Sequence, residues 1–207
     1  MCHTQATPGL TLACPTPTST GVTLDVSTAA GAWEIQLPGG AWAPALAANN
    51  PNWQPVPGAA WIGDDVTGPQ GNISYRVALD ASDPNIDLAS ATLSFSYRAD
   101  NTMLTGTLGG TSLTVTPSAA HNAPAAFDGT AGTSTPLTAG SNALLMVVEN
   151  EFGTDTPYGL AMQATLTFDC RAVTPPAAVP ANAPWALITL SGLMLAGVAA
   201  VRRRKRG

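Results

Sequence analysis

Residues 73–79 read Ile-Ser-Tyr-Arg-Val-Ala-Leu, and this stretch decides the fold class. Every second side chain is large and apolar, which is the two-residue period of a β-strand with one buried face. The same alternation recurs in residues 21–27, 33–37, 91–97 and 160–168. Two further segments have strand character, a hairpin centred on Gly109-Gly110 and a continuous apolar run at residues 144–148 that suits a central strand.

Turn sequences separate these strands at short intervals. Examples are Pro38-Gly39-Gly40, Asp83-Pro84-Asn85 and Gly140-Ser141-Asn142. Many short alternating segments with regular turns predict a sandwich or jelly roll, and no long helical period precedes Trp185. We therefore predict an all-β jelly-roll β-sandwich over residues 21–171, preceded by an N-terminal segment at residues 1–20.

The charge distribution excludes nucleic-acid binding. All 13 acidic residues lie within the first 170 residues, and the only bases there are Arg76 and Arg98. This part of the chain therefore has a net charge of −11. Such a body repels phosphate, because phosphate binding needs clustered Lys and Arg. Only 10% of residues are charged, and Lys and Glu are nearly absent, which is typical of strands and loops in a secreted surface protein.

The C-terminal region predicts a membrane anchor. Residues 172–184 form a Pro/Ala linker, which acts as an extended spacer. Residues 185–201 carry no charge and give about 25 Å of helix, close to the thickness of the hydrocarbon core. We predict one transmembrane helix here, followed by a basic tail at residues 202–207 that stays in the cytoplasm by the positive-inside rule.

This C-terminal region resembles the sorting signals of the PEP-CTERM and IPTL-CTERM class, which exosortases of Gram-negative bacteria read. Members share a proline motif, a Trp, an apolar helix and an Arg-rich end. The matching residues are Val179, Pro180, Trp185, Arg202, Arg203, Arg204, Lys205 and Arg206. The five-residue interval from Pro180 to Trp185 agrees with the IPTL type, although Ala181 and Asn182 stand where that type has Thr and Leu. The resemblance implies an exosortase-type transpeptidase as partner and cleavage near Val179-Pro180.

The same resemblance implies export. The body would lie outside the inner membrane and reach the cell surface or the extracellular matrix after processing. A signal peptide begins with basic residues and continues with an apolar stretch, and residues 1–20 do not show this pattern. We therefore expect a leader that lies upstream of Met1 or has already been removed. An oxidising compartment favours a disulfide between Cys14, before the first strand, and Cys170, at the end of the last, because the two ends of a jelly roll often lie side by side.

No set of residues predicts catalysis, a cofactor or a metal site. His121 lies in a loop without a Gly-x-Ser-x-Gly elbow, and Glu149 and Glu151 have no sugar-cleft sequence beside them. An Asp-x-Asp-x-Asp-Gly calcium loop is missing, so we interpret three closely spaced acids as solvated turn residues, namely Asp80, Asp83 and Asp87. We therefore expect a protein that is not an enzyme.

The order of features in residues 61–168 resembles the galactose-binding-like jelly roll, which sugar-binding modules and structural surface proteins share. The matching pieces are Trp61-Ile62-Gly63, Tyr75-Arg76, Ala99-Asp100-Asn101, Gly140-Ser141-Asn142-Ala143-Leu144, Val147-Val148-Glu149-Asn150 and Tyr158-Gly159-Leu160. Where that family has Val-Asn-Gly between the middle strands, this chain has Leu108-Gly109-Gly110. The resemblance implies the fold and leaves two roles open.

The first role, which we favour, is a structural component of the surface or matrix. The alternative is a carbohydrate-binding module for a neutral polysaccharide, since an acidic body repels anionic glycans. Its candidate residues are loop aromatics with nearby polar groups, namely Trp42, Trp53, Tyr158, Asp100 and Asn101. Trp33 and Trp61 are flanked by apolar residues and are expected in the core.

Overall fold

The computed structural model describes residues 9–64, 67–115, 137–151 and 156–172. The chain divides into two compact units, Met1–Val173 and Thr174–Gly207, and every described residue belongs to the first. Within the described ranges we find no helix with the length and apolarity needed to cross a membrane. The predicted span at residues 185–201, the basic tail and all the sorting-signal residues lie outside those ranges.

The described chain is almost entirely β, as predicted, with a short 3-10 helix, η1 (Thr28–Ala30). A seven-stranded sheet is built on two long neighbours, β8 (Gly71–Ala81) and β12 (Gly140–Asn150), which pair antiparallel along their full lengths. Its remaining strands are β11 (Thr111–Ser112) and β10 (Thr102–Leu108) beside β12, and β3 (Trp33–Gln36), β4 (Ala43–Pro44) and the parallel β1 (Leu10–Thr11) on the β8 side.

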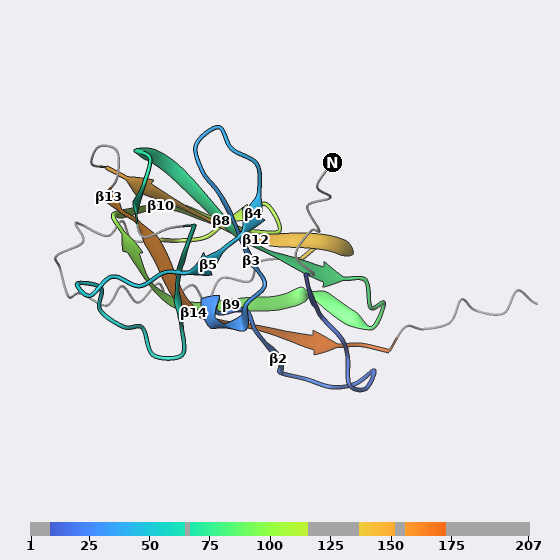
Figure 1. Ribbon diagram of the computed structural model, residues 1–207. Helices are drawn as coiled ribbons and strands as arrows, with labels where there is room; N and C mark the ends of the chain where they lie inside the picture. The colour runs from blue at the N-terminus through green and yellow to red at the C-terminus, as the bar shows by residue number, and fades with distance from the viewer. Residues whose placement is uncertain (1–8, 65–66, 116–136, 152–155, 173–207) are drawn as a thin grey trace, which may run out of the picture. The chain divides into compact units, whose positions relative to one another are not determined.

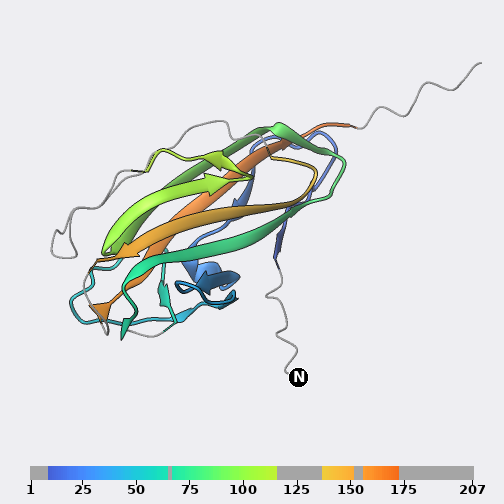
Figure 2. The ribbon, with the colours of Figure 1, turned by 90° about the horizontal axis from the view of Figure 1, so that it is seen from above.

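The five-stranded sheet is built around β14 (Gly159–Cys170). One edge of β14 pairs with the long strand β9 (Ile86–Asp100), and the other pairs in succession with β6 (Trp61–Gly63) and β2 (Val22–Asp25). β5 (Leu46–Ala47) extends the sheet beyond β6, and a separate two-residue ribbon joins β7 (Thr67–Gly68) to β13 (Thr156–Pro157). Figures 1 and 2 show the two sheets as layers of a sandwich.

The core lies between the two sheets and follows the predicted alternation. β8 buries Ile73, Tyr75, Val77, Leu79 and Ala81, and the side chains between them face outward. β9 buries Ala91, Leu93, Phe95 and Tyr97. The apolar run at residues 144–148 also alternates, because β12 buries Leu144, Met146 and Val148 and leaves the two side chains between them half-buried on the outer face. Its predicted central position is confirmed, since β12 lies between β8 and β10.

Two hydroxyl groups fill the gap between β6 and β2 along the edge of β14. The Met162 N–H donates to Thr28 Oγ1 at 3.1 Å, and the Ala164 N–H donates to Ser27 Oγ at 3.0 Å. Thr28 Oγ1 also donates to the carbonyl of Ala60 at 2.5 Å. Buried backbone groups need partners, so these side chains continue the hydrogen bonding of a strand where no strand is present.

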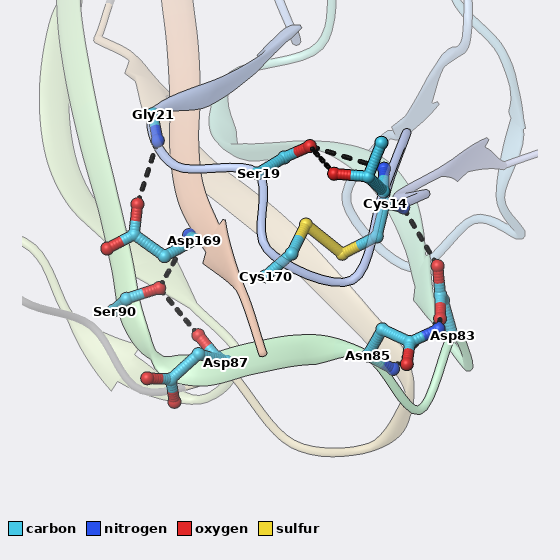
Figure 3. Close-up of a disulfide and its surroundings, with 10 residues drawn as sticks. Cys14, Ser19, Gly21, Asp83, Asn85, Asp87, Ser90, Asp169 and Cys170 are labelled. Atoms are coloured by element: carbon cyan, nitrogen blue, oxygen red, sulfur yellow. Dashed lines mark hydrogen bonds between the residues drawn. A yellow bond between two sulfur atoms is a disulfide. The ribbon is translucent and has the colours of Figure 1, made fainter. Parts of the chain in front are cut away.

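A disulfide joins Cys14 and Cys170, as predicted, with their Cα atoms 5.9 Å apart and a sequence separation of 156. Figure 3 shows it beside the turn between β8 and β9. Cys14 lies within a segment that belongs to the body, because β1 pairs with β8 and Leu12 is buried. The folded body therefore begins before residue 21, the start that the sequence suggested.

Candidate functional site

Three of the candidate glycan residues meet at the end of β9. The indole Nε1 of Trp53 donates to Asp100 Oδ2 at 2.6 Å, and the Asn101 amide donates to Asp100 Oδ1 at 2.8 Å. The backbone N–H of Glu151 in turn donates to Asn101 Oδ1 at 2.9 Å. Asp100 and Asn101 are each only 4% exposed, so their polar groups hold the end of β9 to the Trp53 loop and to the end of β12.

Tyr158 belongs to the core, although the sequence suggested an exposed loop aromatic. It is 1% exposed, and its hydroxyl accepts a hydrogen bond from the Asp64 backbone N–H at 3.3 Å. Gly68 makes room for the ring, because a Cβ atom at residue 68 would lie 2.3 Å from Tyr158 Cε1. The ring therefore has no open face on which a sugar could stack.

A stacked pair of indoles covers the start of β14. The Trp53 and Trp61 rings lie 4.4 Å apart between centroids with 25° between their planes. Both side chains are half-buried, and Gly159 lies beneath them, since a Cβ there would come within 2.8 Å of the Trp53 ring. Trp33 is buried as expected and donates to the Ser27 carbonyl at 3.1 Å, whereas Trp61 is only partly enclosed.

Trp42 packs on a different surface, the outer face of the seven-stranded sheet. Its ring lies over the Arg76 guanidinium, 4.0 Å from the centroid, and Arg76 pairs with Glu34 at 2.7 Å. The β3–β8 register places Glu34 directly opposite Arg76. One face of the half-buried Trp42 is thus used in a cation–π contact. The five candidate residues do not form one site: Trp53, Asp100, Asn101 and Tyr158 gather at one end of the sandwich, and Trp42 lies apart from them.

A shallow hollow of about 390 Å³ lies where β10 ends and β12 begins. Asn142 in its wall accepts from the Thr138 N–H at 3.0 Å and donates to the Thr138 carbonyl at 2.7 Å, so its amide stabilises the turn before β12. The other lining residues are Thr107, Gly109, Gly110, Thr138, Ser141, Ala143 and Leu145. The hollow offers hydroxyl and apolar groups but no aromatic platform for a sugar ring.

One buried polar group was missed by the sequence reasoning. Tyr75 on β8 is fully buried, and its hydroxyl has no hydrogen-bond partner in the described part of the chain. Burial raises the pKa of this hydroxyl well above its ordinary value, and the neighbouring Tyr158, Asp100 and Asp64 add to the rise. In the sequence Tyr75 occupies a buried-face position together with Ile73 and Val77, and nothing in that pattern indicates that its hydroxyl would have no partner.

The acids near the β8–β9 turn cap backbone groups. Asp83 accepts from the backbone N–H groups of Cys14 at 2.8 Å and Asn85 at 2.9 Å, and these two bonds lower the pKa of its carboxyl. Asp80 likewise accepts from the Ser82 N–H at 3.0 Å. No group of three or more metal-ligating side chains occurs among the residues that the structure describes.

Comparison with known proteins adds no relative: no family model matches the chain, and neither a curated protein nor a solved structure matches it.

Proposed function

We propose that this chain is an exported surface or matrix protein of a Gram-negative bacterium, with a structural jelly-roll ectodomain. An exosortase-type transpeptidase reads the C-terminal signal formed by Val179, Pro180, Trp185 and residues 202–206, and cleaves the chain near Val179-Pro180. The ectodomain starts outside the inner membrane, held by the transmembrane helix at residues 185–201. Cleavage then releases it to the cell surface.

The observation that carries this proposal is the Cys14–Cys170 disulfide. Disulfides between structural cysteines persist in oxidising compartments and are rare in the cytosol, so the pairing supports export. A structural role is supported by the use of Asp100, Asn101 and Trp53 in contacts within the fold, where they close one end of the sandwich.

Mass spectrometry of the mature protein from envelope and medium fractions tests the sorting step. We expect a C-terminus near residue 179, and a retained basic tail in the mature protein rejects processing. A Pro180→Ala variant should accumulate uncleaved, whereas Pro184→Ala, in the same linker and outside the proline motif, should be processed normally. Equal processing of both variants would mean that Pro180 is not part of the signal.

The alternative function is binding of a neutral polysaccharide. The half-buried Trp53–Trp61 pair favours it, because partly exposed indoles can stack against the apolar faces of sugar rings. A glycan array separates the two roles. Tight binding that is lost on Trp61→Ala and kept on Trp42→Ala would identify the indole pair as the site and overturn a purely structural ectodomain.

A further inference from the structure

The segments that enter and leave the folded body are held by one turn. The Cys14 N–H donates to the side chain of Asp83, and the Arg171 N–H donates to the backbone carbonyl of Asn85 at 2.7 Å. Asp83 and Asn85 both belong to the turn between β8 and β9, as Figure 3 shows. The two ends of the body therefore lie side by side because each is hydrogen-bonded to the same four-residue connection.

Further bonds tie the two segments to each other. The Cys170 N–H donates to the Ser19 carbonyl at 2.7 Å, and the Gly21 N–H donates to Asp169 Oδ1 at 2.8 Å. These contacts involve backbone and carboxylate groups and do not need the sulfur–sulfur bond. The fold itself thus brings Cys14 and Cys170 within bonding distance.

The disulfide also links the two sheets. Cys14 follows β1, which pairs with β8 of the seven-stranded sheet, and the Leu12 N–H continues that pairing to Asp80 at 2.8 Å. Cys170 is the last residue of β14, the central strand of the five-stranded sheet. The disulfide therefore joins the end of β14 covalently to the segment that follows β1.

We propose that this disulfide is a mechanical bypass, which passes tension from the C-terminal linker to the N-terminal segment without loading the strands that lie between Cys14 and Cys170 in the chain. The proposal rests on the proposed function in one respect, since the C-terminal region is the tether through which tension would arrive before the chain is cleaved. Residues 15–169 lie inside the covalent loop. Tension between residues before Cys14 and residues after Cys170 crosses the two sulfur atoms, so the sandwich adds only the 5.9 Å between the two Cα atoms to the loaded chain.

Without the bond the same tension would act on β14. Its last pairs, Cys170 with Ile86 and Asp169 with Asp87, would be loaded first and could open one after another. Complete unfolding would then release the 156-residue separation, which is about 550 Å at full extension. The bond changes a domain that can lengthen a hundredfold into a link of fixed length.

Single-molecule pulling tests the bypass on the full chain, held by a tag at each end in detergent. The Cys2→Ser background removes the third thiol, which could exchange with the disulfide. We expect no extension step near 550 Å in the oxidised protein, and such a step in the same molecule after reductant is added. Cys14→Ser/Cys170→Ser should give the step without reductant. A step of this size in the oxidised protein overturns the proposal, and so does its absence after reduction.

Thiol labelling in cells separates this proposal from the proposed function. In an exported protein, Cys14 and Cys170 should resist alkylation until a reductant is added. If both cysteines are alkylated in cells while the purified, oxidised chain still shows the bypass, export is wrong and the mechanical inference stands. If the cysteines are protected in cells but the oxidised chain lengthens under force, export stands and the bypass is wrong.

Discussion

Replacing Thr28 by Val should destabilise the sandwich far more than its size suggests. Thr and Val have nearly the same shape, but Val has no hydroxyl to accept the Met162 N–H or to donate to the Ala60 carbonyl. Thr28 is 3% exposed, so water cannot readily replace the lost partner. The change therefore leaves one donor and one acceptor without hydrogen bonds beside the central strand of the five-stranded sheet.

The expected magnitude follows from those two groups. Each buried polar group left without a partner costs about 1–3 kcal/mol, so the two groups together should lower the free energy of unfolding of Thr28→Val by about 2–6 kcal/mol. For a domain whose total stability is about 5–15 kcal/mol, this is a large fraction. Thr28→Ser keeps the hydroxyl and should lose much less, and Thr23→Val, on the exposed face of β2, should change stability by less than about 0.5 kcal/mol.

Urea unfolding followed by tryptophan fluorescence measures these differences, with the disulfide intact in every variant. Amide hydrogen exchange adds a local readout, because the Met162 amide should lose protection in Thr28→Val and keep it in Thr28→Ser. A Thr28→Val protein with the unfolding midpoint of Thr23→Val and an unchanged Met162 amide would refute the idea that the hydroxyl completes the edge of β14.

Three further predictions follow from other contacts. Tyr75→Phe removes a buried hydroxyl that has no hydrogen-bond partner, so it should leave the unfolding free energy unchanged or raise it by up to about 1 kcal/mol; a clear loss in urea unfolding would reveal an unrecognised partner. Gly68→Ala places a Cβ against the Tyr158 ring and should lower the free energy of unfolding by about 1–3 kcal/mol in the same assay. A loss below about 0.5 kcal/mol would show that the ring can move. Asp83 has a lowered pKa because the Cys14 N–H, above all, bonds its carboxylate, so its stabilising effect is complete above about pH 4 and is lost as the pH falls through the lower folded-state pKa. Asp83→Asn should therefore flatten the acid side of the stability profile, and an unchanged profile would contradict the cap.

The strands and their buried faces could be predicted from the sequence because alternation is a local signal. Successive side chains of a strand point to opposite faces, so Ile73 and Val77 share one face and Ser74 and Arg76 share the other. The apolar face is the one that packs on the core. The hairpin at Gly109-Gly110 was predictable on the same grounds, and β10 and β11 pair on either side of it. Predicting the disulfide needed one further step, namely that the two ends of a jelly roll often lie side by side.

The contacts at the ends of the sandwich could not be predicted, because they join residues far apart in sequence. Nothing near Thr28 indicates that its hydroxyl will meet Met162, which is 134 residues away. β9 also extends beyond the predicted segment at residues 91–97, since it runs from Ile86 to Asp100 and keeps pairing with β14 past a register shift. Turn and strand patterns indicate where elements form and leave the partners of individual polar groups open.

The candidate glycan residues show why residue type alone is a weak guide to function in this fold. Trp, Asp and Asn in loops are the groups that bind a sugar, and they are also the groups that close the end of a β-sandwich. Burial distinguishes the two uses, because a carboxylate that must receive a ligand has to keep an open acceptor. Asp100 is enclosed and accepts from Trp53 and Asn101, so its hydrogen bonds hold a loop and a strand end together.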